Sequence, residues 1–375
     1  MFIFGTRPEA IKMAPLIKEM KKNANHIKTI VTVTAQHRDM LDQVLHALRI
    51  IPDYDLNIMI DKQTLTDVTI HSLQGLDKIL QESKPDLILV HGDTTTTLAA
   101  SLAAFYHKIP VGHVEAGLRT GDKYLPYPEE MNRQLTGKLA NLHFAPTALA
   151  KRNLLKENIT EDTIFVTGNT AIDALNITSK KDYKHPVLHR IGDSRLVLVT
   201  THRRENIGKP IESICRALQR LVLKHKDIQV VYPVHLNPKV RKIAYDILGD
   251  KDNIHLIEPL DVMEFHNVLA RSYIVLTDSG GIQEEAPSLG IPVLVLRDTT
   301  ERPEGLETGT LKLTGIKEED IFNITDTLLS NKKEYEKMAK AFNPYGDGEA
   351  SKRIVQAILY YFKLTSSRPK DWHGN

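Results

Sequence analysis

Cysteine is nearly absent from this chain of 375 residues, because Cys215 is its one example, and no internal disulfide can form. Cys215 lies in a helical pattern at residues 210–224, where a small buried hydrophobe is the expected role rather than a reactive thiol. The chain also lacks an apolar stretch of transmembrane length and a signal-peptide layout. These absences predict a cytoplasmic protein that does not bind a membrane.

The chain also has no large excess of positive or negative residues. The formal net charge is +2 and basic residues form no long run, so nothing argues for a nucleic-acid partner. Neither G-x-x-x-x-G-K-[ST] nor G-x-G-x-x-G occurs, which excludes an ATPase loop and a dinucleotide fingerprint, and we expect no cofactor. No metal is assigned either, because zinc-type spacing is absent from the histidines at positions 37, 91, 113, 202 and 235.

The length and the pattern of the chain predict its fold class. With 375 residues, of which 41% are hydrophobic, two domains are expected rather than one. Strand-like apolar runs alternate with helical patterns twice over, and the polar residues 178–193 between the two series are interpreted as a linker. We therefore predict an α/β protein with two doubly wound parallel-sheet domains, 1–177 and 178–349, facing across a cleft that holds the site. Residues 366–375 are expected to be a frayed tail.

Residues 276–304 are the segment on which the predicted site centres, because they read as strand, turn, helix, strand and loop. The Ser-Gly-Gly turn at 279–281 would leave backbone N–H groups free at a helix start, which suits a phosphate. Glu284 and Glu285 could accept hydrogen bonds from a ribose diol, and Arg302 returns positive charge in the next loop. A plain tight turn with two helix-dipole partners explains these residues equally well when they are taken alone.

Polar side chains also follow the other predicted strands, at the sheet edge where ligands of parallel sheets bind. Asp93 could instead be a helix N-cap, and Glu129 and Glu130 could be dipole partners. Residues 202–204 could be a solvated basic patch or a diphosphate site. Glu115 follows a strand directly, and a carboxylate at such a position is more often a functional group or a buried ion-pair partner than a cap. The full set at strand ends is Arg7, Gln36, Asp93 and Glu115 in the first half and His202, Arg203, His235, Glu258 and Ser279 in the second.

Six ordered motifs resemble those of the bacterial non-hydrolysing UDP-N-acetylglucosamine 2-epimerases. They are FGTRPEAIK at 4–12, HGDTT at 91–95, HVEAGLR at 113–119, PEEMNR at 128–133, HRRE at 202–205 and the segment 276–304. The resemblance runs from residue 2 to about residue 364. It implies the glycosyltransferase-B architecture, a homodimer, and interconversion of UDP-N-acetylglucosamine and UDP-N-acetylmannosamine for cell-surface polysaccharides. It also implies that the last helix, within 350–375, packs back on the first domain.

The resemblance assigns roles position by position. It implies that the catalytic residues are Asp93, Glu115, Glu129 and His202, the last at the diphosphate. It implies substrate and UDP contacts by Arg7, Lys12, Arg133, Arg203, Phe265, Ser279, Gly280, Gly281, Glu285 and Arg302, with Phe265 near uracil and Glu285 at the ribose. A second UDP-N-acetylglucosamine acts as activator in bacterial relatives, and its expected contacts are Gln36, Gln63 and His235. Family members commonly have several more residues ahead of the first strand, so the strand at 2–4 is expected to be short or frayed.

The chemistry of the sugar limits the routes by which C2 of UDP-N-acetylglucosamine could be inverted. The hydrogen on C2 is not acidic, because neither C1 nor C3 of the sugar carries a carbonyl. A redox route would need a nicotinamide. The remaining route breaks the C1–O bond while a carboxylate takes the C2 proton, giving 2-acetamidoglucal and UDP. Three alternatives stay open at this point: a glycosyltransferase of the same fold, a hydrolysing relative that releases free N-acetylmannosamine, and a nucleotide-sugar sensor without catalysis.

Overall fold

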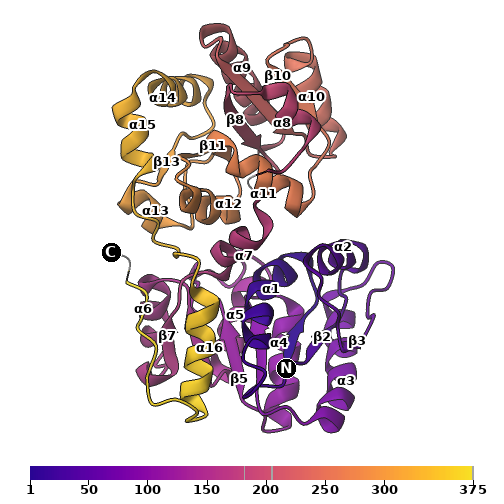
Figure 1. Ribbon diagram of the computed structural model, residues 1–375. Coiled ribbons are helices and arrows are strands. Elements are labelled where there is room, and N and C mark those ends of the chain that lie inside the picture. Colours follow the sequence, from indigo (N-terminus) through magenta and orange to yellow (C-terminus); the bar gives the residue numbers. More distant parts are fainter. Residues whose placement is uncertain (181, 204–205, 374–375) are drawn as a thin grey trace. The chain divides into compact units, whose positions relative to one another are not determined.

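The computed structural model describes residues 1–180, 182–203 and 206–373, in which the chain forms two compact units. Unit 1 comprises Met1–Ala174 and Tyr345–His373, and unit 2 comprises Leu175–Pro344. The chain passes from unit 1 to unit 2 within α7 (Thr170–Thr178) and is back in unit 1 before α16 (Ala350–Tyr361) (Figure 1). These divisions lie a few residues from the predicted boundaries, and the assignment of the two units as domains stays a prediction.

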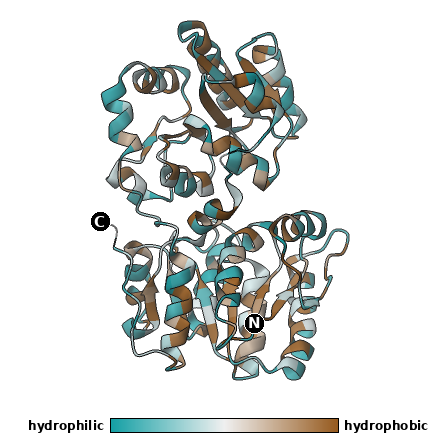
Figure 2. Ribbon diagram, in the orientation of Figure 1, coloured by the Kyte–Doolittle hydropathy of each residue, from teal (hydrophilic) through white to brown (hydrophobic). Residues whose placement is uncertain are grey.

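Unit 1 is built on a seven-stranded parallel sheet with the order β3-β2-β1-β4-β5-β6-β7. All but the edge strand β3 are buried at every residue, and their apolar runs are typical of parallel strands covered on both faces (Figure 2). The strands are β1 (Phe2–Phe4), β2 (Val31–Val33), β3 (Tyr54–Asp55), β4 (Ile88–His91), β5 (Val111–Val114), β6 (Leu142–Ala145) and β7 (Ile164–Val166).

Helices cover this sheet, and their apolar faces are buried against it. In α16, Ile354 and Ile358 lie on the buried face and the helix contacts α1, although the two are at opposite ends of the chain (Figure 1). The helices of unit 1 are α1 (Arg7–Lys21), α2 (Arg38–Leu48), α3 (Leu65–Ser83), α4 (Thr95–Tyr106), α5 (Glu129–Leu139), α6 (Ala148–Lys156), η1 (Glu161–Thr163) and α16.

Unit 2 repeats the plan with a six-stranded parallel sheet in the order β10-β9-β8-β11-β12-β13. Its strands are β8 (Arg195–Thr200), β9 (Ile228–Pro233), β10 (Ile254–Ile257), β11 (Ser272–Thr277), β12 (Val293–Val295) and β13 (Leu311–Leu313). Its helices are α8 (Pro186–Ile191), α9 (Lys209–Lys224), α10 (Pro238–Leu248), α11 (Val262–Ala270), α12 (Gly280–Glu285), η3 (Ala286–Leu289), α13 (Pro303–Thr308), α14 (Glu318–Ser330) and α15 (Lys332–Ala339). The predicted α/β class with two parallel sheets is confirmed.

The strand order reverses once in each sheet, at β1/β4 in unit 1 and at β8/β11 in unit 2. At such a switch point, the two connections leave the sheet on opposite faces, and a crevice forms beyond the carboxyl ends of the strands. The segments that follow β1, β4, β8 and β11 are therefore where each unit should bind a ligand.

One expectation about local structure is wrong. The predicted linker 178–193 contains α8, whose Val187 and Ile191 are buried in the core of unit 2; the pattern was missed because a helix this short shows only two buried positions. The strand β1 is short, as expected, but it is not frayed, because it lies between β2 and β4 and is fully buried.

The predicted frayed tail is also wrong for the described residues up to 373. The guanidinium of Arg368 donates to the carbonyl oxygen of Ile164 (2.8 Å). Asp371 accepts from the backbone N–H of Val166 (3.1 Å), and the N–H of Trp372 donates to the Val166 carbonyl (2.7 Å). Because β7 is an edge strand with unpaired backbone groups, the tail satisfies donors and acceptors that the sheet leaves open.

Asp371→Ala should therefore destabilise the protein. The change leaves a partly buried backbone N–H of Val166 without its acceptor and removes the ion pair with Lys151 (3.1 Å). We expect a loss of about 1–3 kcal/mol in the free energy of unfolding, measured by urea titration. The control Asp61→Ala removes an exposed carboxylate and should stay within about 0.5 kcal/mol of the wild type. Equal stabilities for the two variants would contradict anchoring of the tail.

Candidate functional site

Glu115, directly after β5, is the centre of the polar cluster in unit 1. Lys12 from α1 forms an ion pair with its Oε2, and the side-chain amide of Asn169 donates to the same atom (3.0 Å). His91, the last residue of β4, places its buried Nε2 3.7 Å from that oxygen. Glu115 has φ +65°, a left-handed conformation that a residue with a side chain adopts only when its surroundings hold it, and such residues concentrate at functional sites.

Asp93, two residues beyond β4, is the second carboxylate of the cluster. Burial raises the pKa of Asp93 to about 6; the nearby Arg133 opposes the shift, and the charges of Glu115 and Glu129 add to it. Glu129 begins α5, and its Oε2 is buried without a hydrogen-bond partner among the described residues. Three predicted catalytic carboxylates thus lie close enough to influence one another, with Lys12 and Arg133 between them.

Two of the structural alternatives can now be decided. The N-cap of α4 is Thr94, whose hydroxyl accepts from the N–H of Thr97 (3.1 Å), so Asp93 is not the cap. Glu130 is fully buried and accepts from the backbone N–H of Thr120 (3.1 Å), so its role is to hold the loop ahead of α5. Glu129 makes no such contact with a described residue.

Glu9 is a residue that the sequence analysis missed. It is buried in the first turn of α1 and accepts from the N–H groups of Gly5 (3.0 Å) and Thr6 (2.8 Å). Its other oxygen accepts from the hydroxyls of Thr94 (2.8 Å) and Thr97 (3.1 Å), which follow β4. Glu9 therefore ties together the two turns at the switch point. The Thr-x-x-Glu spacing is a capping-box signature that could have revealed the first two contacts, but not the last two.

The remaining predicted residues of unit 1 lie at the same sheet edge. Arg7 is exposed and makes no hydrogen bond or ion pair with any described residue. Gln63 donates from Nε2 to the carbonyl oxygen of Gln36 (2.8 Å), and Thr96 donates to the Gln36 side chain (3.1 Å), so the two predicted activator contacts of this unit lie together. The third, His235, belongs to unit 2 and is exposed there.

Asp278, directly after β11, organises the switch point of unit 2. It is fully buried and accepts from the N–H groups of His202 (3.1 Å) and Arg203 (3.1 Å) and from the side-chain amide of Asn206 (2.8 Å). Burial opposes a charge on this carboxyl, but the hydrogen bonds, chiefly that from the His202 ring, outweigh it and lower the pKa of Asp278. The backbone N–H groups of residues 202 and 203 and the His202 ring therefore contact a buried carboxylate, while the His202 side chain stays 53% exposed. Of the same motif, residues 204 and 205 lie outside the described residues.

The start of α12 shows why a glycine follows Ser279. A Cβ atom at Gly280 would lie 3.3 Å from Cζ of Arg302, whose guanidinium covers the helix start. Arg302 donates from Nε to Glu284 (2.7 Å), which is buried, so this carboxylate is held by Arg302. Positive charge from Arg302 and the N–H groups of the first helical turn thus meet at one place.

Glu285, the second acid of α12, and Phe265, the predicted uracil contact, both lie near His266 in unit 2. Glu285 Oε2 is 3.5 Å from Nε2 of His266, which is buried. Phe265 is partly buried against the unit 2 core, and its ring lies 6.3 Å from that of His266. The structure therefore places Glu285 beside the histidine that directly follows Phe265 in the chain.

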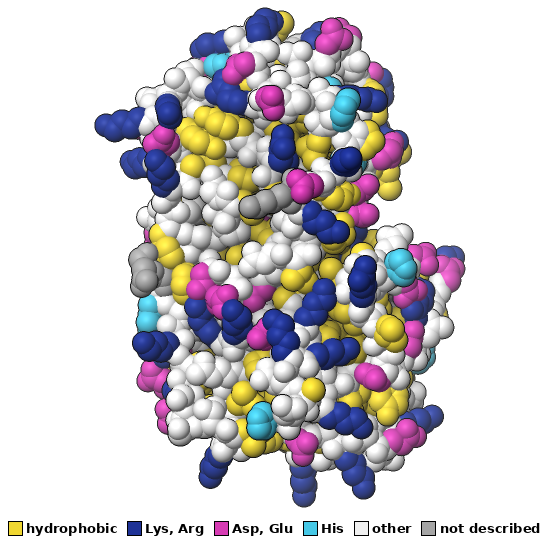
Figure 3. All heavy atoms as spheres, in the orientation of Figure 1, with side chains coloured by type: hydrophobic (Ala, Val, Ile, Leu, Met, Phe, Trp, Pro, Cys, Tyr) yellow, Lys and Arg dark blue, Asp and Glu magenta, His cyan; other side chains and the backbone are white. Residues whose placement is uncertain are grey.

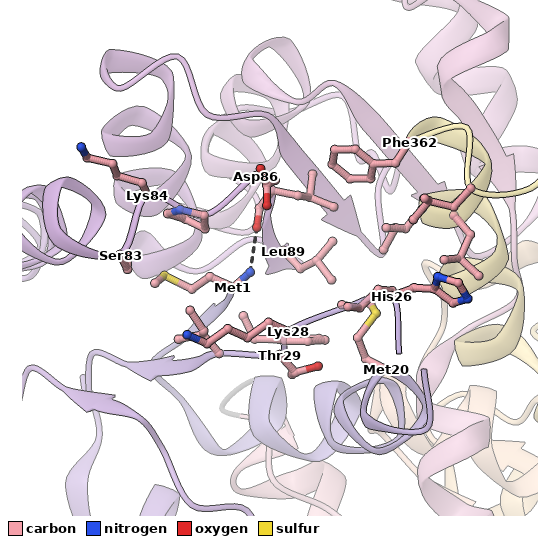
Figure 4. Close-up of a pocket in the computed structure, with 18 residues that line it drawn as sticks. Met1, Met20, His26, Lys28, Thr29, Ser83, Lys84, Asp86, Leu89 and Phe362 are labelled. Carbon is pink, nitrogen blue, oxygen red and sulfur yellow. Dashed lines mark hydrogen bonds between the residues drawn. The ribbon is translucent and has the colours of Figure 1, made fainter. Parts of the chain in front are cut away.

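A pocket of about 410 Å³ in unit 1 is not part of this site (Figure 4). It lies at the amino ends of β1 and β4, where the Met1 ammonium donates to the carbonyl oxygen of Leu87 (2.7 Å), and Met20 and Phe362 line it. Burial lowers the pKa of this ammonium to about 5. All of the predicted site residues of unit 1 follow the opposite, carboxyl ends of the strands.

Three further features concern metal binding, membrane-spanning helices and surface charge. In the described ranges, no group of three His, Cys, Asp or Glu side chains could hold a metal ion. No described helix is both long enough and apolar enough to cross a bilayer. Lys and Arg side chains are interspersed with Asp and Glu over the face in view (Figure 3).

The chain is similar over its whole length to UDP-N-acetylglucosamine 2-epimerases. The family model described as UDP-N-acetylglucosamine 2-epimerase matches residues 18–359. A Bacillus subtilis UDP-N-acetylglucosamine 2-epimerase is 61% identical over 374 residues, covering 100% of this chain and 98% of the relative. A crystal structure of a UDP-N-acetylglucosamine 2-epimerase aligns with a TM-score of 0.94 at 60% identity, covering 100% and 98% of the two chains. The Neisseria meningitidis UDP-GlcNAc 2-epimerase bound to UDP-GlcNAc aligns with a TM-score of 0.84 at 52% identity, covering 96% and 98%.

The raised pKa of Asp93 predicts a pH-dependent stability. A folded-state pKa of about 6, above the ordinary 3.8, means that Asp93 stabilises the fold below about pH 4 and that this contribution is lost as the pH rises through 6. Asp93→Asn should therefore gain stability relative to wild type as the pH rises, by about 1–2 kcal/mol at pH 7 after allowance for solvent screening. Urea unfolding from pH 4 to pH 8 measures it, with Asp61→Asn as control. A pH-independent difference would show that Asp93 titrates normally.

Proposed function

Because this chain belongs to the UDP-N-acetylglucosamine 2-epimerase family, we propose that it interconverts UDP-N-acetylglucosamine and UDP-N-acetylmannosamine by eliminating and re-adding UDP. The family resemblance seen in the motifs is confirmed. The observation that supports the mechanism is the cluster of Asp93, Glu115 and Glu129 beside Lys12 and Arg133 at the unit 1 switch point. Proton chemistry needs carboxylates, whereas passing the sugar to an acceptor would not need three.

The proposed reaction balances in two half-steps. A carboxylate takes the proton from C2, the electron pair of the C–H bond forms a C1=C2 double bond, and the C1–O bond pair leaves with UDP. The intermediates are 2-acetamidoglucal and UDP. Return of a proton to the other face of C2 and re-addition of UDP at C1 give the epimer, so no electrons are gained or lost and no redox cofactor takes part.

In unit 1, we assign the two proton transfers to the set Asp93, Glu115 and Glu129. A carboxyl whose pKa is about 6, such as Asp93, can both take and return a proton near neutral pH. Lys12 balances the charge of Glu115, and Asn169 orients it. The exposed Arg7 would contact the phosphate side of the ligand.

In unit 2, we assign the UDP contacts. The N–H groups of residues 279–281, together with His202 and Arg302, would bind the diphosphate and stabilise its growing charge. Glu285 would accept from the ribose, Phe265 would pack near uracil, and Arg203 would add positive charge. Support comes from the Neisseria meningitidis relative, which was solved with UDP-GlcNAc bound.

The wider role is proposed on the family resemblance. We propose a cytoplasmic homodimer that supplies a precursor for cell-surface polysaccharides. A second UDP-N-acetylglucosamine would act as activator through Gln36, Gln63 and His235. In unit 1, the hydrogen bond between Gln63 and Gln36 supports the first two contacts as one site.

Turnover in D₂O should place deuterium at C2 of the product, because the proton leaves to a carboxylate that exchanges with solvent. The measurement is proton NMR of UDP-N-acetylglucosamine incubated with the enzyme and no acceptor. Retention of protium at C2 would rule out elimination. Free N-acetylmannosamine in place of the nucleotide sugar would identify a hydrolysing enzyme instead, and no turnover without an acceptor would favour a glycosyltransferase.

Glu115→Gln and Glu129→Gln should each lower kcat by roughly 10²–10⁴-fold, the usual cost of removing a general acid or base. A variant damaged in re-addition should also release 2-acetamidoglucal and UDP, quantified by chromatography. The melting temperature of each variant shows whether a fall in kcat comes from the lost carboxylate or from a destabilised fold. The control Glu82→Gln changes an exposed carboxylate on α3 and should match wild type. Near-normal kcat in both test variants would show that the proton is carried by other residues.

A further inference from the structure

Asp278 is a fully buried carboxylate for which the proposed reaction gives no task. We propose that Asp278 is a positioning residue that fixes the ring orientation and the tautomer of His202, so that His202 presents Nε2 to the diphosphate. The inference rests on the proposed function in one respect, because it takes His202 as the diphosphate contact. The assignment itself comes from the contacts of the two residues.

The carboxylate contacts both the ring and the backbone of His202. Oδ1 of Asp278 is 2.9 Å from Nδ1 of the ring, and the N–H of the same residue donates to Oδ1 (3.2 Å) and Oδ2 (3.1 Å). A ring held by the same group that holds its own backbone has little rotational freedom. The His202 side chain is 53% exposed, and no described residue bonds to Nε2.

The chemistry of the pair decides where the proton lies. An ionised carboxylate only accepts hydrogen bonds, and the lowered pKa of Asp278 keeps it ionised near neutral pH. Nδ1 must therefore carry a hydrogen, which leaves Nε2 as the atom that gains or loses a proton. As UDP departs and its diphosphate gains charge, a proton on Nε2 can be donated to it, and the carboxylate behind the ring stabilises the imidazolium.

Neighbouring contacts hold the carboxylate in turn. The N–H of Arg203 (3.1 Å) and the amide of Asn206 (2.8 Å) donate to Oδ2. The buried hydroxyl of Tyr232 on β9 hydrogen-bonds to that of Thr201, which fixes the backbone just before His202. Both acceptor oxygens of Asp278 are therefore occupied, and the carboxylate cannot turn away from the ring.

Asp278→Asn tests the arrangement because it keeps the shape and removes one acceptor oxygen. Two backbone N–H groups and the Asn206 amide need the single oxygen that remains, so the new NH₂ group faces Nδ1 of His202. The ring must then accept at Nδ1 and carry its hydrogen on Nε2. The substitution should invert the tautomer rather than unfold the turn.

The tautomer is measured by ¹⁵N NMR of the full-length protein labelled at histidine, with the His202 signals assigned by their loss in His202→Gln. We expect a protonated Nδ1 in wild type and an unprotonated Nδ1 in Asp278→Asn. Asn206→Ala, which loses a bond to the same carboxylate without touching His202, should keep the wild-type tautomer. A wild-type ring with its hydrogen on Nε2 alone overturns the inference, and this result needs no variant to fold.

Kinetics give an independent readout with UDP-N-acetylglucosamine as substrate. Asp278→Asn should lower kcat by about 10²-fold with little change in KM. The reason is that His202 would no longer donate well to the charge that develops on the diphosphate. In a His202→Gln background, the same substitution should change kcat by no more than about twofold, because the two residues act as one unit. Equal losses in both backgrounds would show a purely structural Asp278. Failure of the elimination mechanism appears separately, as protium retained in D₂O, and leaves the NMR result unaffected.

Discussion

A buried carboxylate that joins two turns is the interaction on which each unit's site depends. In unit 1, Glu9 after β1 accepts from Thr94 and Thr97 after β4, and in unit 2, Asp278 after β11 accepts from His202 and its neighbours after β8. Both lie at the point where the strand order reverses. The turns there leave the sheet on opposite faces, and the carboxylate holds them together.

The cost of burying charge explains how the rest of the unit 1 cluster is arranged. Three carboxylates near one another repel, and Lys12 and Arg133, which pair with Glu115 and Asp93, offset part of this repulsion. Burial, with a smaller contribution from the charges of Glu115 and Glu129, raises the pKa of Asp93 to about 6. Glu115 in the same cluster has a left-handed backbone, a conformation that persists only where the surrounding structure holds it.

Much of the fold could be predicted from the sequence, and the failures have physical causes. The parallel sheets were predictable because strands covered on both faces read as apolar runs. The tail after α16 was not, because Arg368 and Asp371 are polar and their partners on β7 are 204 and 205 residues away in the chain. The helix α8 was missed because only Val187 and Ile191 of its residues are buried.

The sequence by itself determined the fold class, the family and the polar residues at the strand ends, because these depend on local runs, periodicity and ordered motifs. Only the tertiary structure decided which residues serve as supports. Asp278 and His202 are 76 residues apart and meet only because β8 and β11 pair in register, and Thr94 rather than Asp93 is the cap of α4. No local pattern carries such information, because a hydrogen bond between distant turns depends on how the whole sheet is ordered.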